Sequence, residues 1–165
     1  MWEYILTILS AVLLLGFITL GIVKFGLQSC YSAYGMLWKD VYPPINIWSV
    51  ITIISAALMI PVLLEAGENN PWQFLGFLAP VSLFAVAISP DYKTNKMSNI
   101  IHQCGAWGSV IFIIAYLIMI PKLAWLVFPF LIVAIVLGYV FKGTSTLWME
   151  IAAYMSTYTA MFMMP

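Results

Sequence analysis

Six apolar runs, each 18 to 23 residues long, constrain what this chain can fold into. A backbone inside a bilayer must satisfy its own hydrogen bonds, so an apolar run of about 20 residues predicts a membrane-spanning helix. Charged residues, proline or glycine bound each run. The sequence therefore predicts an all-α fold, a polytopic transmembrane helical bundle in one domain covering residues 1–165. The six predicted spans are residues 4–23, 46–64, 72–89, 98–120, 123–141 and 147–164.

The composition excludes the water-soluble classes of protein. Apolar residues make up 64% of the chain and charged residues only 7%, whereas soluble domains are about 25% charged. Six basic and six acidic side chains cannot cover the surface of a soluble domain of 165 residues. Zero net charge and the lack of a basic cluster exclude nucleic acid as a partner. The expected surroundings are a lipid bilayer.

Lysines in the short connections predict the orientation. The two apolar runs around Pro121 and Lys122 exceed 40 residues together, so we expect a tight hairpin there and six crossings in total. Lys122 is the one lysine on its side, and the first, third and fifth connections hold Lys24, Lys39, Lys93, Lys96 and Lys142. These connections are predicted to be cytoplasmic, which places both termini on the non-cytoplasmic side of an inner or plasma membrane. Five tryptophans fall at expected helix ends, the depth that tryptophan prefers: Trp2, Trp48, Trp72, Trp125 and Trp148.

The first cytoplasmic connection, residues 24–45, predicts a further helix. Leu27, Tyr31, Tyr34 and Trp38 recur at the spacing of one helical face. Such a helix either lies in the interface plane or extends the first span. Further along, residues 49–61 and 109–121 match at eight of thirteen positions, which indicates either a parallel duplication of a hairpin or the shared apolar composition of two spans.

His102 and Glu150 are the ionisable residues that fall inside the predicted spans. Such residues are costly in a bilayer unless they are paired or hydrated, so each is a functional hypothesis. Both lie near the cytoplasmic start of their helices, about 6 Å and 4.5 Å along the axis, so they share a depth. If the two helices adjoin, imidazolium and carboxylate can pair. The alternatives are that His102 bonds to a backbone carbonyl and that Glu150 is stabilised by the dipole of its own helix, near whose start it lies.

Polar side chains continue along both helices from these two residues. They follow Glu150 at helical spacing and follow His102 at seven-residue steps, and small residues at 105–109 favour close packing. These two rows of polar side chains are expected to face each other, another helix or a hydrated cavity. The alternative is that they only form hydrogen bonds that hold helices together. The predicted ligand-binding set is His102, Glu150, Tyr154, Tyr158, Ser109 and Tyr116.

A metal site made of His102, Asp91 and Glu150, with Cys104 nearby, is a weaker hypothesis. No ligand pair in the sequence has a diagnostic spacing such as His-Glu-x-x-His. Asp91 is expected to be a solvated acid in a turn, and no cofactor or catalytic residue is predicted.

The leading prediction is a small transporter or channel-like protein. A pocket between the fourth and sixth spans would open to the cytoplasm and bind a proton, a cation or a lipid headgroup through His102 and Glu150. The alternatives are a metal-dependent, lipid-modifying enzyme and an accessory subunit of a membrane complex. A chain this short forms an internal cavity more readily at an interface between subunits than within one subunit. We therefore expect a homo-oligomer or association with another membrane protein.

Overall fold

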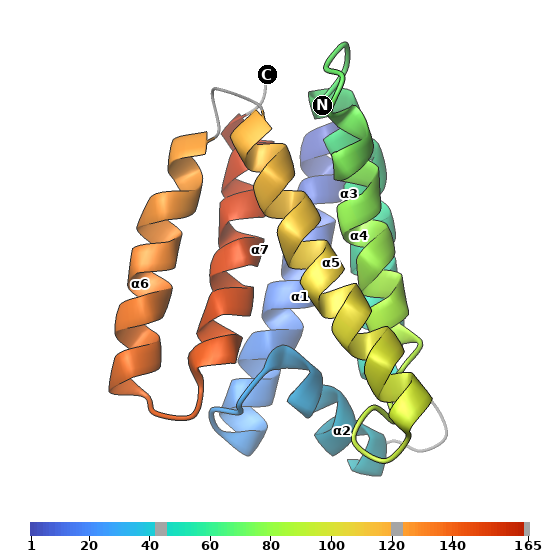
Figure 1. The fold of residues 1–165 in the computed structure, drawn as a ribbon, viewed down its shortest axis with the longest axis vertical. Helices are drawn as coiled ribbons and strands as arrows, with labels where there is room; N and C mark the ends of the chain where they lie inside the picture. The colour runs from blue at the N-terminus through green and yellow to red at the C-terminus, as the bar shows by residue number, and fades with distance from the viewer. Residues whose placement is uncertain (42–45, 120–123, 164–165) are drawn as a thin grey trace.

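The computed structural model describes residues 1–41, 46–119 and 124–163, and its elements are helical throughout these ranges (Figure 1). The all-α class is confirmed, and each of the six apolar runs holds one α-helix. The elements are α1 (Trp2–Phe25), α2 (Tyr31–Val41), α3 (Ile47–Ala66), α4 (Gln73–Ala87), α5 (Lys96–Met119), the 3₁₀ helix η1 (Ala124–Leu126), α6 (Val127–Val140) and α7 (Ser145–Met163). The predicted hairpin turn at Pro121 and Lys122, the boundary at Pro43 and Pro44, and Met164 lie outside the described residues.

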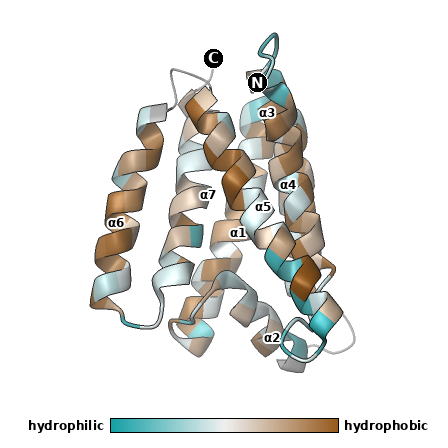
Figure 2. Cartoon of the chain, in the orientation of Figure 1, coloured by the Kyte–Doolittle hydropathy of each residue, from teal (hydrophilic) through white to brown (hydrophobic). Residues whose placement is uncertain are grey.

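Three of these helices are long and apolar enough to cross a membrane. They are α1, α3 and α5, and α4 and α6 are shorter apolar helices. Exposed large apolar side chains lie along α1, α5 and α6. In Figure 2 hydrophobic colour predominates on α6, whereas hydrophilic colour marks the connections. Exposed apolar faces of this extent indicate an integral membrane protein in contact with lipid.

The helices form a bundle in which α3 and α4 stand at one edge and α6 at the other (Figure 1). α4 packs along both α3 and α5, α1 packs along α3, and α6 packs mainly along α7. α1 begins and α7 ends at the same end of the bundle (Figure 1). We call the other end the α2 end; it carries α2 and the connections at residues 26–30, 88–95 and 141–144.

Local chemistry explains where several helices begin and end. Gly26 ends α1 with a φ of 73°, a conformation that side chains with a Cβ rarely adopt. Asn46 caps α3 by accepting the Ser49 backbone N–H at 3.3 Å. Asn95 caps α5 in the same way, accepting the Met97 N–H at 2.9 Å. The polar residues at these ends satisfy backbone groups that have no partner inside a helix.

The helix predicted in the first connection is present as α2, and it is separate from α1. Its Tyr31 and Tyr34 side chains are buried against the bundle, so the aromatic face turns toward protein. Two glycines allow this close approach. A Cβ at Gly21 would lie 2.7 Å from the Tyr34 ring, and one at Gly35 would lie 2.5 Å from the Trp48 ring. α2 is therefore wedged between α1 and α3, and Trp48 is buried rather than placed at a lipid interface.

The small residues of α5 pack against α4. A Cβ at Gly105 would lie 2.7 Å from the backbone oxygen of Ser82 and 2.9 Å from the Cβ of Ala85. The prediction of close packing at these residues is confirmed, with α4 as the partner helix. The repeated segments do not form equivalent hairpins, because α3 packs along the helix that follows it, whereas α5 packs mainly along the helix that precedes it.

Candidate functional site

Tyr31 joins four helices at the α2 end. It is the first residue of α2, its side chain is 2% exposed, and its ring contacts Phe17 of α1, Trp48 of α3 and Tyr154 of α7. Its hydroxyl lies 2.9 Å from Thr52 Oγ1. The Thr52 hydroxyl donates to the Trp48 carbonyl, so Tyr31 is the donor to Thr52. Burial raises the pKa of the Tyr31 hydroxyl, which keeps it protonated and able to donate.

Glu150 of α7 holds the start of α2. Its Oε2 accepts the backbone N–H of Tyr31 at 2.6 Å. The first N–H groups of a helix have no partner within that helix, and a carboxylate that accepts one forms a charge-assisted hydrogen bond. A second bond lies beside it, from the Leu147 N–H to the Ser29 carbonyl at 3.0 Å. Two hydrogen bonds thus tie the first two turns of α7 to Ser29 and Tyr31, where the connection from α1 meets α2.

No cation faces Glu150 within ion-pair distance in the part of the chain that the structure describes. The ion pairs there are Met1 with Glu3 and Lys39 with Asp91. Glu150 is partly buried. A carboxylate held mainly by an N–H dipole in an apolar setting lacks the compensation that a buried charge requires.

His102 of α5 lies in a stack of aromatic rings at the same end of the bundle. Its side chain is 4% exposed, and its ring lies 4.1 Å from the Tyr92 ring, centroid to centroid, with an angle of 13° between the planes. The Trp48 ring lies 6.3 Å away on the α3 side. Among the described residues, His102 Nδ1 and Trp48 Nε1 are buried ring nitrogens without a hydrogen-bond partner, which is rare in folded proteins. The His102 ring also interacts with the backbone of Val86 and Ser89, as in the alternative of a histidine bonded to the backbone.

Tyr92 covers His102 from the connection between α4 and α5. Its hydroxyl accepts a hydrogen bond from Ser32 of α2 at 3.4 Å and lies 4.0 Å from the Cys30 sulfur. Burial raises the pKa of Tyr92 to about 12, so the hydroxyl stays neutral at physiological pH.

His102 and Glu150 each lie within the first seven residues of a helix that begins at the α2 end, and no ion pair joins them. His102 contacts Trp48, Trp48 contacts Tyr31, and the Tyr31 N–H bonds to Glu150. The two titratable groups are therefore linked through an aromatic pair from α2 and α3. Tyr154 joins the same group of side chains through the Tyr31 ring.

Tyr158 connects α7 with α1 and α3 deeper in the bundle. Its hydroxyl lies 2.8 Å from Ser10 Oγ and 3.3 Å from Ser55 Oγ. The two serines also lie 2.8 Å apart, oxygen to oxygen. This cluster bonds three helices together at a buried position, as expected for polar side chains between apolar helices.

Tyr116 and Ser109 form hydrogen bonds away from Glu150. The Tyr116 hydroxyl donates to the Leu63 carbonyl at 2.7 Å and so joins α5 to α3. The Ser109 hydroxyl donates to the Ala106 carbonyl within its own helix, at 2.9 Å. Of the six residues in the predicted set, the structure thus gathers His102, Glu150 and Tyr154 around Tyr31 and Trp48.

The three side chains considered for a metal site do not come together. Asp91 pairs with Lys39 at 2.6 Å, and both side chains are exposed. Across residues 1–41, 46–119 and 124–163, no three His, Cys, Asp or Glu side chains form a group that could hold a metal ion.

Sequence reasoning missed Trp48 and Tyr92 as members of the site. Trp48 has the position of an interfacial tryptophan, and Tyr92 lies in a polar connection, so nothing in either pattern indicates contact with His102. Tyr31 was identified only as part of a helical face. Comparison of the chain with protein-family models, with curated proteins and with solved structures finds no match.

Proposed function

We propose that the chain is a six-span integral membrane protein whose α2 end faces the cytoplasm. Five lysines lie on the helices and connections at this end: Lys24, Lys39, Lys93, Lys96 and Lys142. The opposite end carries Glu3, Glu65 and Glu68. Lysine-rich connections favour the cytoplasmic side. α7, at 19 residues, is about 28 Å long and so approaches the thickness of a bilayer core.

We further propose that the protein binds a proton or a small cation at Glu150 and moves it across the membrane, as a small transporter or channel-like protein. The observation that supports this most directly is the partly buried carboxylate of Glu150, whose Oε2 accepts the Tyr31 N–H at 2.6 Å and which has no cationic partner within the described ranges. A bound proton removes the uncompensated charge, and a bound cation balances it. Either event relieves the cost of holding a carboxylate in an apolar setting.

His102 is the proposed second group on the route. Imidazole both donates and accepts protons near neutral pH. Its Nδ1 is buried without a hydrogen-bond partner among the described residues, beside Trp48, whose ring contacts Tyr31 at a centroid distance of 5.7 Å. His102 and Glu150 are thus proposed as two separate proton-binding groups at the α2 end, each of which exchanges its proton with water, because ring contacts and an amide N–H do not relay protons.

Flux into liposomes tests the proposal. The full chain is reconstituted with a trapped pH-sensitive dye, and a potassium diffusion potential drives proton entry. We expect flux above that of empty liposomes for the wild type, loss of flux in Glu150→Gln and slower flux in His102→Ala. Glu150→Gln removes the charge but retains an oxygen that accepts the Tyr31 N–H, so α2 stays in place. Sodium and potassium gradients with matching dyes distinguish a cation from a proton.

Glu68→Gln is the matched control, because it makes the same chemical change at an exposed acid at the other end of the bundle. It should leave the flux unchanged. Wild-type flux equal to that of empty liposomes for every ion would contradict the proposal. So would equal flux in the wild type and Glu150→Gln, since Glu150 would then serve only to hold the first turn of α2.

A further inference from the structure

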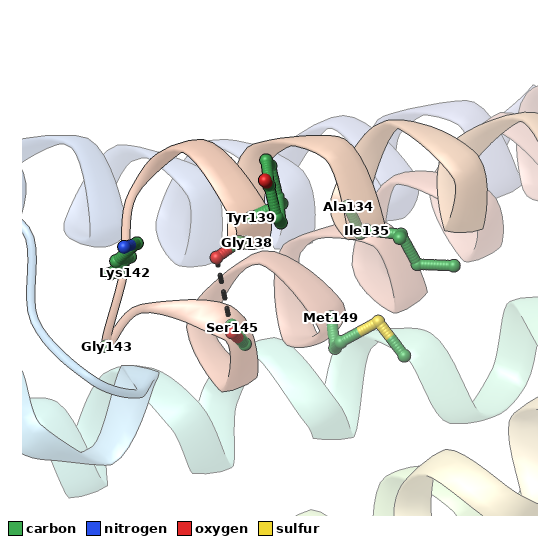
Figure 3. Close-up of a pocket in the computed structure, with 8 residues that line it drawn as sticks. All are labelled: Ala134, Ile135, Gly138, Tyr139, Lys142, Gly143, Ser145 and Met149. Carbon is green, nitrogen blue, oxygen red and sulfur yellow. Dashed lines mark hydrogen bonds between the residues drawn. The ribbon is translucent and has the colours of Figure 1, made fainter.

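A groove between α6 and α7 lies on the outer surface of the bundle at the α2 end (Figure 3). Its volume is about 510 Å³, within the range of ligand-binding pockets. Ala134 and Gly138 of α6 lie one turn apart along it, and Ile135 of α6 and Met149 of α7 line its apolar part. This groove shares no lining residue with the contacts around Glu150, so it is a separate site.

Small residues create the groove. A Cβ at Gly138 would lie 3.1 Å from Ser145 Cα, so the two helices approach closely at their connected ends. Figure 3 shows the hydrogen bond there, in which the Ser145 hydroxyl donates to the Gly138 carbonyl at 3.4 Å. The backbone therefore forms the floor at this end, and the larger side chains of Ile135 and Met149 border the apolar part.

The polarity of the groove changes along its length. Lys142 and Ser145 lie at the end near the connection between the helices, and the Lys142 amine forms no ion pair within the described part of the chain. Ile135 is 58% exposed and Met149 is 44% exposed farther into the apolar region. α6 ends at Val140, about 7.5 Å along its axis from Ile135, and Lys142 lies two residues beyond that end. The groove thus has a cation, Lys142, at the end expected at the membrane surface and an apolar wall deeper in the membrane. An anionic phospholipid has the complementary order, with a negatively charged headgroup above its acyl chains.

We propose that the α6–α7 groove binds one anionic phospholipid. Its phosphate contacts the Lys142 amine and takes the Ser145 hydroxyl proton in place of the Gly138 carbonyl, and one acyl chain lies along Ile135 and Met149. Lysines at the cytoplasmic surface attract anionic lipids, whereas a zwitterionic headgroup carries its own compensating cation. Tyr139, which is 81% exposed at the rim, is an aromatic residue at the depth where tyrosine favours headgroups.

Native mass spectrometry of the full chain tests this site. The protein is released from nanodiscs that contain equal amounts of phosphatidylglycerol and phosphatidylcholine with the same acyl chains. We expect the wild type to retain one phosphatidylglycerol with about fivefold preference, the effect of one lysine at a membrane surface. Lys142→Gln should reduce this preference to near one, and Lys142→Arg should keep it.

Lys96→Gln is the charge control, since Lys96 lies at the same end of the bundle but outside the groove. It should retain the lipid like the wild type. Met149→Trp fills the groove and should lower retention, whereas Val136→Trp, at an exposed position that does not line the groove, should not.

Three results would overturn the proposal. One is equal retention of the two lipids by the wild type. Another is an equal loss in Lys142→Gln and Lys96→Gln, which would show attraction by the whole surface rather than by a site. The third is a dimer without bound lipid that Met149→Trp dissociates, which would assign the groove to a second copy of the chain.

Discussion

Replacing Gly105 by alanine tests the close contact between α4 and α5. The new Cβ would lie 2.7 Å from the Ser82 carbonyl oxygen and 2.9 Å from Ala85 Cβ. Neither neighbour is the end of a flexible side chain, so the helices must separate by roughly 0.7 Å to reach ordinary van der Waals contact. Overpacking of this kind costs about 1–3 kcal/mol of the free energy of unfolding.

Two other glycines complete a graded series. A Cβ at Gly16 of α1 meets nothing within 4 Å, so Gly16→Ala should stabilise its helix by up to about 1 kcal/mol. A Cβ at Gly108 would lie 3.0 Å from Ser82 Oγ, a hydroxyl that can rotate away, so Gly108→Ala should fall between the other two. Because all three substitutions carry the same gain in helix propensity, the difference between Gly16→Ala and Gly105→Ala isolates the steric cost.

Unfolding by sodium dodecyl sulfate in mixed micelles measures these free energies. Circular dichroism reports helix loss, and the intrinsic fluorescence of the seven tryptophans reports the loss of packing. We expect Gly105→Ala to be less stable than Gly16→Ala by about 1–3 kcal/mol. Equal stability of the two variants would refute the close approach of α4 and α5 at Gly105.

Two further predictions concern tyrosines. Tyr116→Phe should cost only about 0.6 kcal/mol in the same unfolding assay, because the Leu63 carbonyl keeps its bond from the Gly67 N–H; a loss above 2 kcal/mol would contradict this account. Tyr92 has a pKa raised to about 12 in the fold, against about 10 in an unfolded chain, so the stability it contributes is present below pH 10 and is lost as pH rises toward 12. Spectrophotometric titration should show one late-ionising tyrosine fewer in Tyr92→Phe, and an unchanged titration curve would exclude the burial of its hydroxyl.

Helix positions were predictable from the sequence because the length of an apolar run and the residues that break a helix act locally. The first run was predicted at residues 4–23, and α1 covers Trp2–Phe25. Lys24 lies inside the helix, with its amine over the Trp38 ring at 4.4 Å from the centroid, and Gly26 is the residue that ends α1. A charged residue therefore marks the end of a span less sharply than a glycine does.

The neighbours of each helix were not predictable. Helices that are apolar on every face carry no stripe that identifies the inner side. The small residues around Gly105 were predicted to be a packing surface, but nothing in the sequence identifies Ser82 and Ala85 as the residues that they contact. The partner of Glu150 is the backbone N–H of Tyr31, a group that every residue except proline carries and that therefore leaves no signature in a sequence.

The hydrogen bond between Tyr31 and Glu150 joins residues 119 positions apart, which sets an order for assembly during synthesis. The first turn of α2 leaves the ribosome long before its carboxylate acceptor exists. Until α7 packs against the bundle, the Tyr31 N–H lacks this acceptor. The hydrogen bond between α2 and α7 therefore forms only when the last helix joins the bundle. A nascent chain that ends before α7 would leave the Tyr31 N–H at the start of α2 without this acceptor.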